Sequence, residues 1–325
     1  ADSHFLPCVT GKHAFGQIID GPDAGRKAAR TAFKYGADQI KIMATGGVMS
    51  FGDEPGAPEL TYEEMKAIID VAASKGKITS AHAHGAEGIK IAVRAGITSI
   101  EHGMLMDEEC MDMMAEHGTY LIPTIIAAHN IVVNGVASGI PAWAVEKAER
   151  CLENHYENLK KCMAKGVKIG FGTDTGTPFN RHGEQAFEFE LMKKAGFTTE
   201  YILQAATRIN AEMMKMDKQI GTIEAGKLAD IVAFDASPMD DIKVMANCSF
   251  VMKDGVGLIP IPLTRIPETK VPLHGGTLMG GIGFAMYGGA IADYASMVFP
   301  VIGEYTKLVG VGIITLFFAA TIKGS

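Results

Sequence analysis

Cysteine is scarce in this sequence, and no two cysteines form a CxxC pair. The spacing therefore gives no disulfide framework and no zinc-finger pattern, and the thiols are predicted to be reduced, with no metal or disulfide role. This usage is typical of a cytoplasmic protein. The five cysteines are Cys8, Cys110, Cys151, Cys162 and Cys248.

Positive charge is also in short supply. The chain carries 30 lysines and arginines against 37 aspartates and glutamates, for a formal net charge of −7, and it has no basic cluster. This balance argues against nucleic acid as the main partner. Neither a GxGxxG motif after the first predicted strand nor a phosphate-binding loop is present, so a nucleotide-binding fold has no direct support.

A leader pattern is missing as well. Residues Ala1–Lys12 have no basic region followed by an apolar core, so they are not a signal peptide. Because the sequence begins with alanine and not methionine, we expect its start to be a cut.

Glycine, in contrast, is abundant, with 38 residues, and it separates helical from apolar extended segments between Pro22 and Asp174. The predicted strands are Ala37–Met43, Lys77–Ala83, Thr98–His102, Thr119–Thr124 and Val167–Thr173. The predicted helices are Pro22–Tyr35, Thr61–Ser74, Ala86–Ala95, Asp107–Glu116, Ala142–Ala164, His182–Lys194 and Thr199–Met216. Alternating helices and strands predict a parallel α/β sheet with right-handed crossovers, either a barrel or a doubly wound sheet.

The C-terminal third has a different character. Short β segments at Ala229–Phe234 and Phe250–Lys253, with a turn signal at Asp254–Gly255, predict a small β unit. Further on, Gly276–Ala292 and Leu308–Ile322 carry no charge and approach the ~20 apolar residues of a spanning helix. They indicate either membrane contact through the tail or a buried pair of soluble helices.

Polar residues occur at the ends of four predicted strands: Lys41, His82 with His84, His102 and Asp174. In a barrel these strand ends form one face, where active sites lie. A hydrogen-bonded histidine or a capping aspartate would explain each residue alone. Together, two imidazoles and a carboxylate suit Zn²⁺ or a similar divalent ion, which lowers the pKa of water. Lys41 could join them only as a carbamate formed with CO₂, which could bridge two metal ions.

The segments that contain these residues, together with two further segments, resemble the amidohydrolase superfamily, closest to its imidazolonepropionase-like and prolidase-like dipeptidase branch. The matching segments are KIMATGGVMS, AHAHGAEGIK, SIEHG, TYLIPT, GTDTGTPF and GTIEAGKLADIVAFD, and the resemblance runs from Ala1 to about Gly255. It implies a (β/α)₈ TIM barrel with an attached β-sandwich. It also implies metal-dependent hydrolysis of the C–N bond of a small substrate, such as a dipeptide or a cyclic amide.

The resemblance also implies a role for each strand-end residue. Lys41 would be the carboxylated lysine, His82 and His102 would be ligands of a second metal ion, and Asp174 would bind the first ion and accept the proton of the attacking water. His82 is preferred to His84 because it is predicted to lie within the strand. Three further residues are weaker candidates for substrate contacts or for support of the ligands: His84, Arg181 and His182.

The chain departs from the family pattern in two respects. The His-x-His pair of the first barrel strand is absent, so the predicted strands would be strands four to eight of an incomplete barrel. Its open edges are expected to aggregate or to pair with another chain, and a homo-oligomer is predicted. The tail resembles a fragment of an amino acid permease. The predicted domains are residues 1–218 (partial barrel), 219–257 (β-sandwich remnant) and 258–325 (tail).

Three alternatives remain open from the sequence. Lys41 could form a Schiff base with a carbonyl substrate, as in barrel aldolases, without any metal. The chain could also be a catalytically incomplete fragment fused to a permease fragment, or a transporter-derived protein in which the tail is the working part. In the hydrolase, the long loop Ala44–Leu60 is predicted to border the substrate pocket as a lid.

Overall fold

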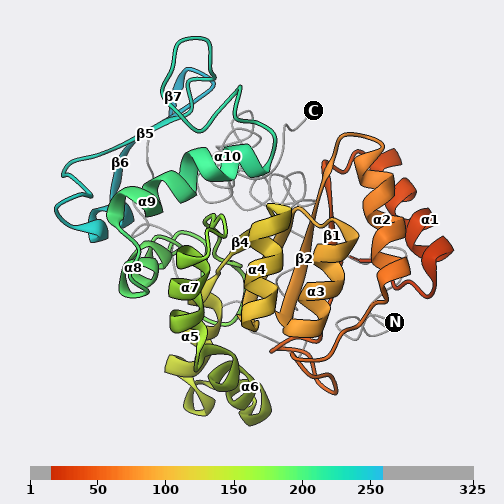
Figure 1. The fold of residues 1–325 in the computed structure, drawn as a ribbon. Coiled ribbons are helices and arrows are strands. Elements are labelled where there is room, and N and C mark those ends of the chain that lie inside the picture. Colours follow the sequence, from red (N-terminus) through yellow and green to blue (C-terminus); the bar gives the residue numbers. More distant parts are fainter. Residues whose placement is uncertain (1–15, 259–325) are drawn as a thin grey trace, which may run out of the picture.

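A four-stranded parallel sheet organises the computed structural model, which describes residues 16–258. Its strands pair in chain order (Figure 1). They are β1 (Gln39–Met43), β2 (Ile78–Gly85), β3 (Ser99–Leu105) and β4 (Tyr120–Ile122). The parallel α/β sheet predicted from the sequence is thereby confirmed. The predictions of membrane contact and of a permease-like fragment fall on residues 259–325, which lie outside the described residues.

One face of this sheet is covered by helices. They are α1 (Pro22–Lys34), α2 (Tyr62–Ala73), α3 (Ala86–Ala95) and α4 (Glu108–His117), with α3 and α4 drawn in front of the strands and α2 beside them in Figure 1. Ile42, Ala81, Ile100 and Leu121 form one row across the four strands, and all four side chains are buried. Side chains alternate between the faces of a strand, so this row faces the helices and the neighbouring positions face the opposite side.

A fifth extended segment, at residues 167–173, lies beside β4. Leu121 and Ile169 form a parallel bridge, and the Leu121 N–H donates to Lys168 O at 2.9 Å. On the opposite edge, the Ile169 N–H donates to the Tyr201 hydroxyl at 3.0 Å, and the Asn210 side-chain amide pairs with the backbone N–H and C=O of Phe171. An open barrel edge would leave the backbone groups of this segment unpaired. That expectation is wrong at Ile169 and Phe171, because side chains of the following helices take the place of a neighbouring strand.

The remaining helices differ from the prediction in their boundaries, and α5 was not predicted from the sequence. They are α5 (Ile125–Asn134), α6 (Ala142–Leu152), α7 (His155–Ala164), α8 (Phe187–Lys194), α9 (Thr199–Gln204) and α10 (Asn210–Met213), with short turns η1 (Val136–Ser138), η2 (Ala205–Ile209, π-helical) and η3 (Ile242–Ala246). The single helix predicted over Ala142–Ala164 is two helices. Cys151, His155 and Leu159 are buried at intervals of four residues, so the pattern of buried positions continues across the break and does not reveal it.

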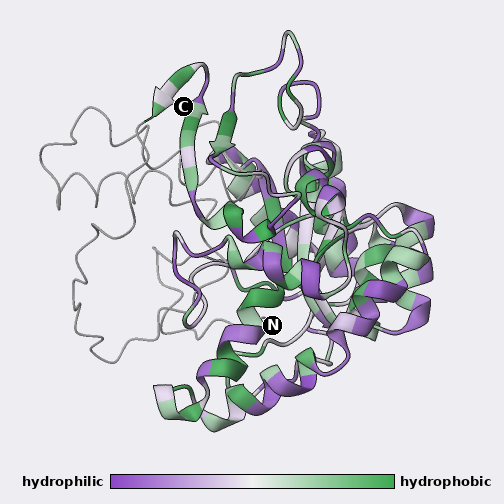
Figure 2. Cartoon of the chain, turned by 90° about the vertical axis from the view of Figure 1, so that its left-hand side faces the viewer, coloured by the Kyte–Doolittle hydropathy of each residue, from purple (hydrophilic) through white to green (hydrophobic). Residues whose placement is uncertain are grey.

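The C-terminal end of the described chain forms a separate antiparallel sheet of β5 (Ile231–Phe234), β6 (Cys248–Lys253) and β7 (Val256–Leu258). Asp254 and Gly255 link β6 to β7 with φ values of 51° and 79°. Positive φ at both positions is typical of a two-residue hairpin turn, as the Asp-Gly pair predicts. Hydrophobic residues lie along these strands in Figure 2, and Val232, Phe250 and Val256 are exposed.

None of the helices between residues 16 and 258 combines the length and apolar character needed to cross a membrane. Hydrophilic and hydrophobic residues alternate along the helices in Figure 2, which fits helices with one buried face.

The loop Ala44–Leu60 packs on the C-terminal end of β2 and is tied to α6 by Lys147. The Lys147 ammonium donates to Ser50 O and to Asp53 Oδ1, both at 2.8 Å. The side chains of Lys147 and Asp53 are 8% and 2% exposed. A Cβ on Gly46 would lie 2.3 Å from Glu54 O, so glycine is required for this close approach. The predicted lid is thus a compact loop held by a buried ion pair.

Substituting Lys147→Met is expected to lower the free energy of unfolding by about 3–5 kcal/mol, because it removes the positive charge that faces the buried Asp53 carboxylate. Urea unfolding of the full chain measures this loss. Arg150→Met is the matched control, one turn along α6, since it removes an exposed ion pair with Glu54 and should cost no more than about 1 kcal/mol. Equal losses in the two variants would contradict a special role for Lys147.

Candidate metal centre

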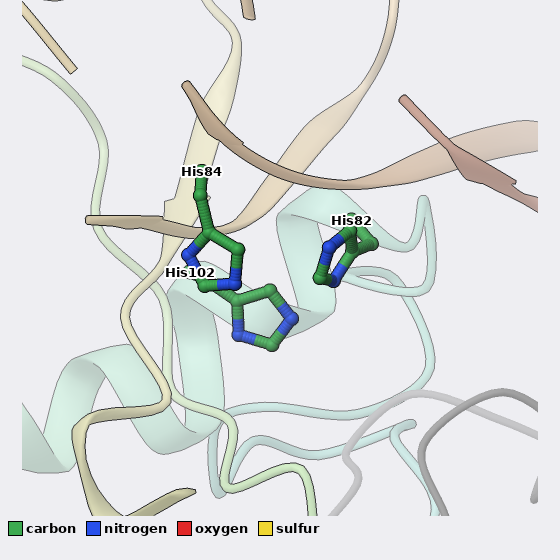
Figure 3. Close-up of side chains that lie close together, drawn as sticks. All are labelled: His82, His84 and His102. Carbon is green, nitrogen blue, oxygen red and sulfur yellow. The ribbon is translucent and has the colours of Figure 1, made fainter. Parts of the chain in front are cut away.

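Three histidine side chains meet at the C-terminal ends of β2 and β3 (Figure 3). His82, His84 and His102 are all buried, and one ligand-type nitrogen from each lies within 4.8 Å of the others. The His82 ring centroid is 4.8 Å from each of the other two, and the His84 and His102 rings stack at 4.9 Å. Across the described residues 16–258, this is the one group of three or more His, Cys, Asp or Glu donors so arranged.

The hydrogen bond made by His82 determines which of its nitrogens can bind a metal ion. Its Nε2 lies 3.0 Å from Gly46 O in the loop after β1. A carbonyl oxygen only accepts, so Nε2 carries the proton and Nδ1 carries the lone pair. His82 can therefore coordinate a metal ion through Nδ1.

His102 reaches the cluster by an unusual backbone conformation. Strict alternation along β3 would place it on the side of Ile100, which faces the helices, but His102 has φ of 74° and its ring lies against His82 and His84. Left-handed backbone at a residue with a Cβ is strained and is concentrated at functional sites. Thr124 and Asp174, which also follow extended segments, have φ of 45° and 50°.

The proton of His102 is fixed by Thr124. Nδ1 of His102 lies 2.6 Å from Thr124 Oγ1, which also lies 2.9 Å from Pro123 O. Both contacts are hydrogen bonds only if the hydroxyl donates to the carbonyl and accepts from the Nδ1–H of His102. The lone pair of His102 is then on Nε2, and Nε2 is the nitrogen that can bind a metal ion.

His84 belongs to the cluster as closely as the other two histidines. The reason for preferring His82 to His84 was wrong, because β2 continues to Gly85 and contains both residues. The His84 ring lies edge-on to His82 and stacks on His102, and its backbone N–H donates to Thr45 Oγ1 at 3.0 Å.

Burial keeps the imidazole of His102 neutral. It lowers the pKa of His102 well below its ordinary value, and positive charge on His82, His84 and Lys41 lowers it further. Neutral imidazole is the form that binds a metal ion. The donor set therefore fits a divalent ion of the Zn²⁺ type, which prefers nitrogen ligands.

Lys41 and Asp174 lie near this cluster without belonging to it. Lys41 is half-buried on β1, in register with Ser80, and its charge acts on both His102 and Asp174. Burial raises the pKa of Asp174 to about 6, while Lys41 opposes this rise and Glu101 adds to it. The two residues are thus placed to interact electrostatically with each other at the edge of the cluster.

The other two sequence candidates lie on the loop after Asp174. Arg181 and His182 are exposed, and Arg181 Nη1 is 4.0 Å from Glu184 Oε1. The structure gives no reason to group them with the histidines, so a substrate contact by either residue stays a prediction.

Three residues that contribute to the site were not predicted from the sequence. Gly46 and Thr124 accept the hydrogen bonds that orient His82 and His102, and Glu101 lies beside His82 in the sheet register. The motifs KIMATGGVMS and TYLIPT contain Gly46 and Thr124, but no spacing rule connects either residue to a histidine on another strand.

Known proteins are similar to this chain over much of its length. The sequence model of the amidohydrolase family matches residues 4–257. An ochratoxinase from Aspergillus niger is 34% identical over 231 residues, which cover 70% of this chain and 47% of that protein. An imidazolonepropionase from Thermoanaerobacter pseudethanolicus is 27% identical and covers 55% of this chain and 39% of that protein. The chain thus spans about half the length of the ochratoxinase and less of the imidazolonepropionase.

Solved structures of similar proteins include two peptidases. A Xaa-Pro dipeptidase with methionine bound in its active site is 39% identical, with a TM-score of 0.70, over 75% of this chain and 60% of that one. A prolidase complexed with N-methylphosphonate-L-proline is 33% identical, with a TM-score of 0.73, over 79% and 64%.

Proposed function

Because the chain belongs to the amidohydrolase family, we propose that it contributes to the metal-dependent hydrolysis of C–N bonds in a small substrate. The observation that carries this proposal is the cluster of His82, His84 and His102, in which hydrogen bonds to Gly46 and Thr124 direct Nδ1 of His82 and Nε2 of His102 to metal binding.

The proposed ligands are His82, His102, Lys41 and Asp174, with His84 close enough to take part. When bound, a divalent ion, Zn²⁺ in our proposal, supplies Lewis acidity to the scissile carbonyl and lowers the pKa of water. Lys41 would bind after its neutral amine adds to CO₂, which forms an N–C bond and releases one proton. The resulting carbamate has the charge and shape of a carboxylate.

Asp174 is proposed to accept a proton from the attacking water. With a pKa of about 6, its carboxylate is ionised at neutral pH and close enough to that range to release the proton again to the leaving amine. The low pKa of His102 keeps that ring neutral, and Gly46 O and Thr124 Oγ1 orient His82 and His102, so the chain presents a preorganised set of donors.

The names of the relatives indicate a substrate class. An ochratoxinase, a Xaa-Pro dipeptidase and a prolidase are similar to this chain, and a prolidase structure contains a phosphonate analogue with proline. We propose an amide with an amino acid on one side of the scissile bond. Xaa-Pro specificity is one form of this proposal, and a cyclic amide is another.

The test is hydrolysis by the purified full chain, supplied with Zn²⁺ and bicarbonate, of Xaa-Pro dipeptides, other dipeptides, N-acyl amino acids and cyclic amides. Release of an amino acid from at least one class is expected, with loss on chelation and recovery with Zn²⁺. A folded chain that holds zinc at the histidines but hydrolyses none of these substrates would contradict the proposal.

A further inference from the structure

The turn at Pro123–Ile126, after β4, carries the threonine that orients His102. Thr124 occupies the N-cap position of α5, with φ of 45° and ψ of 43°. An N-cap threonine normally accepts a hydrogen bond from a backbone N–H of the first helical turn. Thr124 makes no such bond. Its backbone is left-handed and not extended at this position, and its hydroxyl contacts Pro123 O and His102 Nδ1.

The capping role at this helix is filled by Glu188, from α8. Its Oε1 accepts from the Ile125 N–H at 2.9 Å and its Oε2 accepts from the Ile126 N–H at 2.7 Å, across 63 and 62 residues of sequence. The side chain is fully buried. In contrast, α2, α4 and α9 are capped by the local side chains Thr61, Asp107 and Thr198.

A second buried group fixes the other end of the turn. His155 Nε2, on α7, lies 3.2 Å from Pro123 O, the carbonyl that also accepts from the Thr124 hydroxyl. The two lone pairs of Pro123 O then accept from His155 and from Thr124. The hydroxyl proton of Thr124 therefore points at Pro123 O and away from His102. The turn is held on both sides by helices distant in sequence.

A buried carboxyl group is a costly way to cap a helix when a threonine already stands at the N-cap. Burial raises the pKa of Glu188 to about 8, although the two N–H donors oppose this rise. The arrangement makes physical sense if the hydroxyl of Thr124 is needed elsewhere. Its other partner, His102, is a proposed metal ligand.

We propose that Glu188 is a positioning residue that takes over the capping of α5, so that Thr124 can hold the proton of His102 on Nδ1 and direct Nε2 into the metal site. The inference rests on the proposed metal centre for its function. Its structural consequence, the tautomer of His102, exists without any metal ion.

The test is Glu188→Gln in the full chain, with ¹⁵N NMR of His102 in the metal-free protein and a Zn²⁺ titration as the two measurements. The NH₂ group of the introduced glutamine faces one of the two backbone N–H groups and cannot accept a hydrogen bond from it. The Thr124 hydroxyl can then turn away from His102 and accept from that N–H instead. We expect the Nδ1–H tautomer to become a mixture and Zn²⁺ affinity to fall about 10–100-fold, as for other groups that support a ligand.

The matched control is Glu64→Gln. Glu64 is also buried and also accepts from two backbone N–H groups, those of Gly21 and Thr61, on the helix-covered side of the sheet. This variant should lose stability while the His102 tautomer and the Zn²⁺ affinity stay unchanged. A role of Glu188 in stability alone predicts the same pattern for both variants.

Variants of Thr124 test the route of the effect. Thr124→Val should reproduce the changes of Glu188→Gln, and Thr124→Ser should retain the wild-type tautomer. Adding Glu188→Gln to Thr124→Val should lower Zn²⁺ affinity no further, because the two residues act through one bond.

A folded Glu188→Gln chain with the wild-type tautomer and Zn²⁺ affinity would overturn the proposal. If Glu188→Gln does not fold, Glu188→Asp decides by the same two measurements, with a smaller change expected in the same direction. A changed tautomer in a chain that hydrolyses nothing would support Glu188 as a positioning residue and count only against the proposed function.

Discussion

Replacing His102 with alanine is expected to reduce hydrolysis to background and to lower Zn²⁺ affinity strongly. The loss of affinity should exceed the roughly 10–100-fold that follows removal of a residue that only supports a ligand. The substitution removes the Nε2 donor itself, and it leaves His82 and His84 facing a space the size of an imidazole ring. The measurements are zinc content after dialysis and the rate of substrate hydrolysis.

The control for this substitution is His117→Ala. His117 is exposed near the end of α4, where its Nδ1 contacts Met113 O, and its removal should leave zinc content and rate as in the wild type. Retention of wild-type zinc affinity by a folded His102→Ala chain would show that the histidine cluster is not the metal site.

Replacing Asp174 with asparagine is expected to slow hydrolysis by about 10²–10⁴-fold, the usual contribution of a positioned general base. The substitution should also change how zinc binding depends on pH. Burial raises the pKa of Asp174 to about 6 in the metal-free chain. Below that pH the carboxyl is protonated and must release its proton before it can accept a cation, so wild-type affinity should fall as the pH drops from 7 to 5.

In the Asp174→Asn chain this component of the pH dependence should be absent. The low pKa of His102 keeps that ring neutral over the same range, so His102 adds little to the slope. Zinc titrations at several pH values in both chains provide the comparison. Identical pH dependence in the two chains would argue against Asp174 as a ligand.

Sequence periodicity predicted the elements that bring the site together. The alternation in β1 and β2 places Lys41 and His82 on the side of the sheet opposite Ile42 and Ala81, and the strand ends were identified within a few residues. A parallel sheet then brings those ends to one edge, so the meeting of His82 and His102 could be expected from the sequence.

The orientation of the ligands could not be predicted in the same way. His102 turns to the cluster through a φ of 74°, and no residue pattern marks that position as left-handed. The bond from Thr124 to His102 and the cap that Glu188 provides for α5 join segments far apart in sequence. Such contacts follow from tertiary packing and have no signature in local spacing.

Helix α5 was missed for a related reason. Its segment Ile125–Asn134 follows Pro123 and an apolar strand. Apolar residues fall on every side of this helix, so its helical periodicity is weak. Asn210 and Tyr201, which cover the edge of the segment at residues 167–173, likewise act through side-chain hydrogen bonds to a distant backbone. The carbamate on Lys41, the homo-oligomer, the cytoplasmic location and the incomplete barrel stay predictions.

The most direct test of the metal centre is the number of divalent ions that the full chain binds at neutral pH with Zn²⁺ and bicarbonate supplied, determined by equilibrium dialysis and elemental analysis. We expect at least one tightly bound ion per chain in the wild type and none in the folded double variant His82→Ala, His102→Ala. A wild-type chain that binds no ion, or a double variant that binds as well as the wild type, would contradict the assignment of the histidine cluster as a metal site.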